Sequence, residues 1–264
     1  RQRQMCIRDR NYEGAIYQVF SSVEQLATML QSKNETERKA KEFLKDTISD
    51  ISHQLKTPLA ALAMYQEIIE SEPENAETVK QFAAKMGISL KRMEQLILSM
   101  LKITRLDTGN IIFEKKSCRV SELIAHSVNE LTARAKNENK QIQIDGDGEQ
   151  KLICDMEWTG EAIGNIVKNA LDHTQVGGIV RITWNRAPAM FQIFISDNGS
   201  GIAPEDIHHI FKRFYRSKHS IDTQGIGLGL PLAKSIIEGQ GGVISVQSES
   251  GKGTLFTLSF LTEL

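Results

Sequence analysis

Apolar residues in the first hundred positions recur at steps of three and four, the spacing of one face of an α-helix. The pattern predicts a helix from about residue 11 to 30, followed by a highly charged connector that continues as a helix. Two longer apolar stripes follow, over 44–69 and 79–106. The turn "SEPEN" at 71–75 separates these stripes, and "DTGN" at 107–110 ends the second. Two long helices joined by a short turn form a helical hairpin.

A lone hairpin cannot cover the apolar stripes of both its helices. Two hairpins paired as a four-helix bundle would bury them. The sequence therefore predicts a homodimer.

Beyond Gly109 the pattern changes to short strands that alternate with helices. Helices are predicted over 120–139, 156–174 and 231–240, the first of them capped by Ser121. Strands are predicted over 110–114, 140–145, 151–155, 178–185, 190–198, 241–250 and 253–261. Helices with a mainly antiparallel sheet indicate a two-layer α/β sandwich, so the expected fold class is α+β.

Composition narrows the class of protein. Hydrophobic residues make up 40% and charged residues 25%, as in ordinary globular proteins. A net charge of −1 argues against nucleic acid as a general partner. Cys6, Cys118 and Cys154 lack metal-ligand spacing and indicate reduced thiols rather than a disulfide framework.

The start of the chain is unusual. "RQRQMCIRDR", residues 1–10, has four arginines and no initiator Met, and it is interpreted as a tag, a gene-prediction artefact or the cut end of a longer protein. Residues 11–43 are then a linker helix. No apolar run approaches the roughly 18 residues of a membrane span, so attachment to a membrane is expected only through a segment upstream.

One histidine stands out on the first hairpin helix. At about 100° per residue, His53 lies about 200° from Ile51 and Leu55, so it points away from the apolar stripe. Thr57, four residues on, shares its face, and Pro58 is expected to kink or loosen the helix. An exposed neutral imidazole is a competent nucleophile near pH 7.

The stretch "SHQLKTPLA" at 52–60 resembles the H-box of the sensor histidine kinases. The resemblance implies that His53 is the phosphorylated residue and that Thr57 helps to position water for removing phosphate from the partner. The family commonly has Glu or Asp directly after the histidine, where this chain has Gln54. An amide can orient an imidazole but is a poor base.

Five later segments resemble, in order, the N, G1, F, G2 and G3 boxes of the same family. They are "NIVKNALDHT" (165–174), "DNGSGI" (197–202), "IFKRFYRSK" (210–218), "GIGLGL" (225–230) and "GKGT" (251–254). Each is weak alone, but the ordered set is specific. The resemblance implies a Bergerat-type ATP-binding fold with a mixed sheet, shared with DNA gyrase, the heat-shock chaperone ATPases and MutL, that uses ATP and Mg²⁺.

The resemblance also assigns roles. Asn169 would hold Mg²⁺ through its amide oxygen, Asp197 would accept a hydrogen bond from the adenine amino group, and Arg216 would neutralise charge on the γ-phosphate. The polar segment 215–224 is expected to be a mobile lid. The full set of expected ATP-binding residues is Asn165, Asn169, His173, Asp197, Gly199, Gly201, Arg216, Gly225, Gly227, Leu228, Gly229 and Thr254.

Two further departures qualify the resemblance. Asp172 stands where many relatives carry Lys, which removes a possible phosphate contact, and His173 stands where many carry Tyr. His173 could still stack or hydrogen-bond.

Three functions remain open. In a histidine kinase core, residues 44–106 would form the dimerising phosphotransfer hairpin and residues 111–264 the catalytic domain, with an aspartate of a response regulator as the final acceptor. The complete protein would be anchored in the cell membrane with this part in the cytoplasm. An ATP hydrolase of the gyrase type is disfavoured, because Asn165 stands where those enzymes carry Glu. A pseudokinase or phosphatase-dominant module stays open through Gln54 and Asp172.

Overall fold

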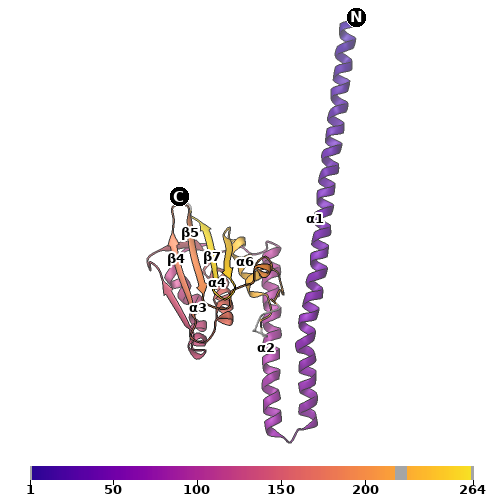
Figure 1. Cartoon of the computed structure of the whole chain (residues 1–264). Helices are drawn as coiled ribbons and strands as arrows, with labels where there is room; N and C mark the ends of the chain where they lie inside the picture. Colours follow the sequence, from indigo (N-terminus) through magenta and orange to yellow (C-terminus); the bar gives the residue numbers. More distant parts are fainter. Residues whose placement is uncertain (1, 218–224, 263–264) are drawn as a thin grey trace. The chain divides into compact units, whose positions relative to one another are not determined.

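The computed structural model describes residues 2–217 and 225–262, with side chains described from residue 21 onward apart from a few between 36 and 46 (Figure 1). The chain divides into two compact units, one ending at Ala63 and one beginning at Met64.

The predicted linker and the first hairpin helix form one continuous helix, α1 (Gln2–Ser71). Pro58 lies inside α1 without ending it, so its ring removes one backbone hydrogen bond while the turns on either side persist. Val23, Leu26 and Leu30 of the linker are exposed in the single chain.

The second hairpin helix is α2 (Ala76–Asp107), which follows a turn at the predicted place. Asn75 caps α2, since its side chain accepts a hydrogen bond from the backbone N–H of Thr78 at 3.2 Å. Within the unit that begins at Met64, the last turns of α2 are buried at Leu96, Met100 and Ile103.

A small two-stranded antiparallel sheet pairs β1 (Lys116–Arg119) with β3 (Lys151–Cys154). The strand predicted over 110–114 is wrong, because residues 111–115 join no ladder and the strand begins at Lys116. The backbone N–H of Glu114 instead donates to a carboxylate oxygen of Asp155 at 2.9 Å. A side chain has taken the donor that strand pairing would need.

The helix α3 (Val120–Asn137) begins one residue after β1. The predicted cap at Ser121 is also wrong, since Arg119 occupies the N-cap position without a capping side chain. The Ser121 hydroxyl donates instead to the carbonyl of Gly148 at 3.0 Å, which ties the helix to the turn before β3.

The main sheet has the order β2-β4-β5-β7-β6. Its β2–β4 pair is parallel and its other pairs are antiparallel, so the predicted mixed sheet is confirmed. Alternate residues of the central strands are buried, as expected when helices cover one face. The strands are β2 (Gln141–Asp145), β4 (Ile179–Arg186), β5 (Met190–Asp197), β6 (Val243–Glu249) and β7 (Gly253–Leu261).

The helices α4 (Met156–His173) and α6 (Gly229–Gly239) form the other layer with α3. Each contributes apolar side chains to the core, and Ile163, Ile166 and Ile236 are fully buried. A single turn of helix, α5 (Pro204–Ile207), follows β5. The predicted two-layer α/β sandwich is therefore confirmed.

Candidate phosphoacceptor and nucleotide sites

His53 lies on the exposed side of α1. Its side chain is exposed, whereas Ile51 and Leu55 are half-buried, as the helical phase predicts. The exposed hydroxyl of Thr57 lies one turn further along and donates to the carbonyl of His53 at 3.5 Å. The imidazole can therefore be reached from solvent in the single chain.

Asp197 is the last residue of β5, where the strand meets the glycine-containing loop. The backbone N–H of Gly199 donates to its carboxylate at 2.9 Å. Burial raises the pKa of Asp197 above its ordinary value, and backbone hydrogen bonds from Gly199 and Thr254 oppose that rise. Thr254, its neighbour across the ladder on β7, is buried. A half-buried carboxylate can accept more than these two hydrogen bonds, so Asp197 is suited to accept one from a ligand.

The loop after Asp197 is pressed between two other segments. A Cβ added to Gly199 would lie 2.3 Å from the carbonyl oxygen of His173, and one added to Gly201 would lie 2.1 Å from that of Glu249. The backbone N–H of Ser200 donates to the carbonyl of His173 at 3.1 Å. Only glycine allows both approaches, so these two positions bring the G1 loop against the end of α4 and the β6–β7 hairpin.

A hydroxyl that the sequence interpretation missed joins the G1 and G3 segments. Ser248 on β6 lies 3.0 Å from the hydroxyl of Thr254 and accepts a hydrogen bond from the backbone N–H of Ile202 at 2.9 Å. It donates in turn to the carbonyl of Gly253 at 2.8 Å. The sequence signal that could have revealed it is its place near the end of the strand predicted over 241–250, just before the turn that leads to Thr254.

Two asparagines of α4 lie four residues apart on the helix. The amide of Asn165 donates to the carbonyl of Glu161 at 3.0 Å, and a Cβ added to Gly229 would lie 3.2 Å from its side-chain oxygen. The N-box helix and the G2 segment are therefore in contact. Asn169 is half-buried, and no hydrogen bond joins its side chain to any described residue.

The G2 glycines lead into the start of α6. Gly227 has φ +75°, and its carbonyl accepts a hydrogen bond from the backbone N–H of Phe214 at 2.9 Å. Leu228 occupies the N-cap position, and no side chain caps the helix. Backbone N–H groups at this end are therefore available to an anion, which the helix dipole also favours.

The F-box region is described only in part. Arg216 is exposed. Residues 218–224, which make up most of the predicted lid, lie outside the described residues. The placement of Arg216 toward a phosphate stays a prediction.

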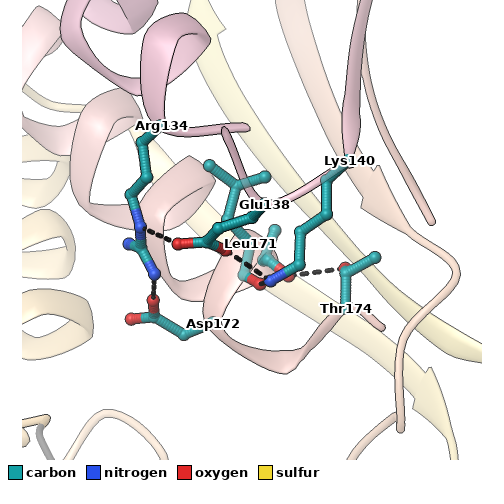
Figure 2. Close-up of polar contacts among 7 residues, drawn as sticks. Arg134, Glu138, Lys140, Leu171, Asp172 and Thr174 are labelled. Atoms are coloured by element: carbon teal, nitrogen blue, oxygen red, sulfur yellow. Dashed lines mark hydrogen bonds and ion pairs between the residues drawn. The ribbon is translucent and has the colours of Figure 1, made fainter. Parts of the chain in front are cut away.

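Asp172 has a structural partner that the sequence did not reveal. Arg134 of α3 donates to its carboxylate at 2.5 Å and to that of Glu138 at 2.6 Å (Figure 2). Lys140 pairs with Glu138 at 2.6 Å and donates to the carbonyl of Leu171 at 2.8 Å. A lysine at the carboxyl end of a helix interacts favourably with its last carbonyls. This cluster fixes the end of α4 next to His173.

Families of known proteins match both parts of the chain. The model of the "His Kinase A (phospho-acceptor) domain" matches residues 43–109. The model of the "Histidine kinase-, DNA gyrase B-, and HSP90-like ATPase" matches residues 154–264. The chain belongs to the sensor histidine kinases. An ATP-binding domain of this type supports the use of ATP.

The chain is similar to sensor proteins of two bacteria. The chain is 30% identical over 217 residues to the sensor-like histidine kinase SenX3 of Mycobacterium tuberculosis, covering 81% of this chain and 53% of SenX3. It is also 30% identical over 217 residues to the sensor protein SrrB of Staphylococcus aureus, covering 81% of this chain and 37% of SrrB. The chain thus spans about half the length of SenX3 and less than half the length of SrrB.

Solved structures share the fold. A histidine kinase, ThkA, in complex with the response regulator protein TrrA superposes with a TM-score of 0.69 at 21% identity, covering 88% of this chain and 66% of ThkA. The Acinetobacter baumannii histidine kinase AdeS gives 0.65 at 18% identity, covering 79% of this chain and 97% of AdeS. Among the helices of the described residues, none combines the length and the apolar character that crossing a bilayer requires.

Proposed function

We propose that this chain is the core of a sensor histidine kinase that transfers the γ-phosphoryl group of ATP to His53 and from there to an aspartate of a response regulator. The observation that carries the proposal is the pairing of an exposed helical histidine with a separate site in which Asp197, Asn165 and the start of α6 belong to one compact unit. Residues 44–106 would form the dimeric phosphotransfer hairpin, residues 111–264 the catalytic domain and residues 11–43 the helix that receives the signal.

Nucleotide binding is assigned to three parts of the site. Asp197 accepts a hydrogen bond from the adenine amino group, and Gly199 and Gly201 let the loop after Asp197 pack closely on the backbone of His173 and Glu249. The N–H groups at the start of α6, beside Gly227 and Gly229, bind phosphate oxygens. The hydroxyls of Thr254 and Ser248 join the two strand ends that lie beside Asp197.

The donor set also fits Mg²⁺, a hard cation that takes few protein ligands besides water and substrate phosphates. Asn169 would hold the ion through its amide oxygen, which no described residue occupies. When bound, the ion neutralises phosphate charge during transfer. Arg216, from the F-box, adds a second positive charge on the γ-phosphate.

At the acceptor end, the neutral imidazole of His53 attacks phosphorus. The bond from the γ-phosphorus to the bridging oxygen breaks, and ADP leaves. Gln54 orients the ring but is a poor base, so the imidazole proton passes to water or to a phosphate oxygen of ADP. Thr57, one turn away, positions water for a separate reaction, the hydrolysis of the regulator's aspartyl phosphate, which releases inorganic phosphate. ThkA has been solved with a response regulator protein, and a like partner is proposed for this chain.

ATP hydrolysis as the main activity is not favoured by the site. Asn165 occupies the place at which gyrase-type enzymes carry Glu, and its amide is engaged with the carbonyl of Glu161. The carboxylate of Glu161 itself pairs with Lys102 at 2.6 Å. Membrane anchoring of a longer protein stays a prediction.

Nucleotide binding tests the catalytic half directly. Calorimetry with ADP should show that Asn169→Ala weakens binding in the presence of Mg²⁺ by about tenfold or more and has little effect in EDTA. Such a loss of a charge-assisted contact is worth about 1.5–3 kcal/mol. Asn129→Ala, an exposed asparagine on α3, is the matched control. Equal weakening of binding with and without Mg²⁺ would contradict the assigned role.

A further inference from the structure

Cys118 and Cys154 lie face to face across the small β1–β3 sheet. Their sulfur atoms are 3.4 Å apart, and both cysteines are unpaired thiols. Cys118 is opposite Leu152 in the antiparallel register and Cys154 is opposite Lys116, so the two cysteines are diagonal neighbours on the same face. Thirty-five residues separate them in the sequence, and only the strand pairing brings them together.

The two thiols differ in their exposure to solvent. The hydrogen bond with Cys154 lowers the pKa of Cys118, which is half-buried. The contact with Cys118, together with burial, raises the pKa of Cys154. Because Cys118 is half-buried and Cys154 is buried, an oxidant reaches Cys118 first, and Cys154 is held beside it as the resolving thiol.

We propose that Cys118 and Cys154 are an oxidative modification site that closes to an intramolecular disulfide when the chain meets a peroxide. The Cys118 thiolate attacks one peroxide oxygen, the O–O bond breaks, and water and a sulfenic acid form. The Cys154 sulfur then attacks the Cys118 sulfur and displaces the hydroxyl, which leaves as water with the Cys154 proton. Two thiols and one peroxide give one disulfide and two waters.

Closure would reach the nucleotide site through the start of α4. A disulfide requires the sulfurs to approach to about 2.05 Å, from 3.4 Å here. The next residue, Asp155, caps α4 by accepting a hydrogen bond from the backbone N–H of Trp158 at 3.1 Å, and its other oxygen holds Glu114. Its own backbone N–H donates to the Gln240 side chain, just beyond α6, at 2.8 Å. Moving Cys154 therefore displaces the helix that carries Asn165 and Asn169.

The cross-link is tested on the full chain with Cys6→Ser, which leaves only the pair. The reduced protein is treated with hydrogen peroxide, unfolded and alkylated, then measured by mass spectrometry and peptide mapping. The proposal predicts that neither thiol is alkylated and that the mass is lower by two hydrogens than that of the reduced, unalkylated chain. Peptide mapping should find a peptide that joins Cys118 to Cys154, and dithiothreitol should reverse the cross-link. The same chain with Cys154→Ser should form no intramolecular cross-link.

Two results would overturn the site. The first is that both thiols are still alkylated after peroxide, in protein shown by circular dichroism to be folded. The second is that the cross-link joins two chains.

The expected effect of the disulfide on nucleotide binding rests on the proposed function, whereas formation of the disulfide does not. The oxidised chain should bind ADP about fivefold or more weakly than the reduced chain, in the range usual for coupled sites. Binding restored by dithiothreitol, with no effect of peroxide on the Cys118→Ser chain, would support the coupling. A cross-linked chain that binds ADP as tightly as the reduced chain would overturn it, and absence of ADP binding in both forms would instead contradict the proposed function.

Discussion

Asp197 is the residue whose surroundings say most about ligand binding. Asp197→Asn retains the size of the side chain but places an amide where the ionised carboxylate accepts hydrogen bonds from Gly199 and Thr254. We expect the affinity for ADP to fall by about tenfold or more, as for loss of a hydrogen bond to a charged group. Calorimetry measures this, and Asp147→Asn, on an exposed turn, is the control.

The raised pKa of Asp197 gives that affinity a pH dependence. An ordinary Asp is half-protonated near pH 3.9, and burial moves the midpoint of Asp197 upward. Binding that needs the carboxylate should therefore weaken as the pH falls through this raised pKa, earlier than for an exposed aspartate. The stability of the fold changes in the opposite direction: it rises as the pH falls through the pKa of Asp197, because protonation removes the cost of burying the charge. The Asp197→Asn chain, titrated in parallel, should lack this component of the ADP binding curve, and a curve identical to wild type would contradict the assignment.

Substitution of Gln54 tests how the proton of the phosphoacceptor His53 is removed. Gln54→Glu supplies a carboxylate beside His53, and general-base assistance contributes about 10²–10⁴-fold in favourable cases. We expect autophosphorylation to accelerate at saturating ATP, up to roughly 10²-fold, with unchanged nucleotide affinity. Gln25→Glu, exposed on the same helix, controls for added charge. A rate unchanged by Gln54→Glu would show that this position takes no part in proton removal.

At the residue scale, the sequence predicts the surroundings of a side chain when they depend only on its own helix or strand. The exposure of His53 followed from helical phase alone. The role of Asp172 did not, because Arg134 is 38 positions away and meets it only when α3 packs on α4. The same holds for Ser248, whose partner lies across a β-ladder.

At the scale of elements, Lys140 joins α3, α4 and β2. Its ammonium is largely buried between the Glu138 carboxylate and the Leu171 carbonyl. Lys140→Met keeps much of the side-chain volume but removes the ammonium from both acceptors, which then keep only Arg134 and the backbone N–H of Thr174 as donors. We therefore expect a free energy of unfolding lower by about 1.5–3 kcal/mol. Urea unfolding measures the change, and Lys136→Met, on the exposed side of α3, should change it little.

The loss of stability in the Lys140→Met variant should depend on pH. The hydrogen bond from Lys140 is the main reason that the pKa of Glu138 lies below its ordinary value. A depressed carboxylate pKa stabilises the fold above the unfolded value, near 4.3, and this contribution is lost as the pH falls through the folded value. The difference between wild type and Lys140→Met should therefore narrow in acid and leave the part due to Leu171. A difference that widens in acid would contradict the pairing.

Element prediction succeeded where the apolar period was long and failed where side chains intervened. The two hairpin helices and the five strands of the main sheet lie close to their predicted ranges. The strand predicted over 110–114 failed because Asp155, 41 positions from Glu114, accepts its backbone N–H. No local pattern contains that contact.

For the whole molecule, the main expectation is a homodimer. Ile97 and Leu101 lie one turn apart on α2, and each is about half exposed in the single chain, at 47% and 52%. Burying both in a four-helix bundle would contribute roughly 25 cal/mol per Å² of apolar area. The double variant Ile97→Lys with Leu101→Lys should sediment as a monomer at concentrations at which wild type is a dimer. Gln95→Lys, exposed on α2, should remain dimeric, and a monomeric wild type would contradict the bundle.

The central claim, that this chain phosphorylates its own His53, is tested most directly with γ-labelled ATP and Mg²⁺. Wild type is compared with His53→Ala and with His126→Ala, an exposed histidine on α3 that serves as the control. The account predicts label that is labile in acid, stable in base, present on wild type and His126→Ala and absent from His53→Ala. Label that persists on His53→Ala, or wild type that binds ATP and acquires none, would contradict it.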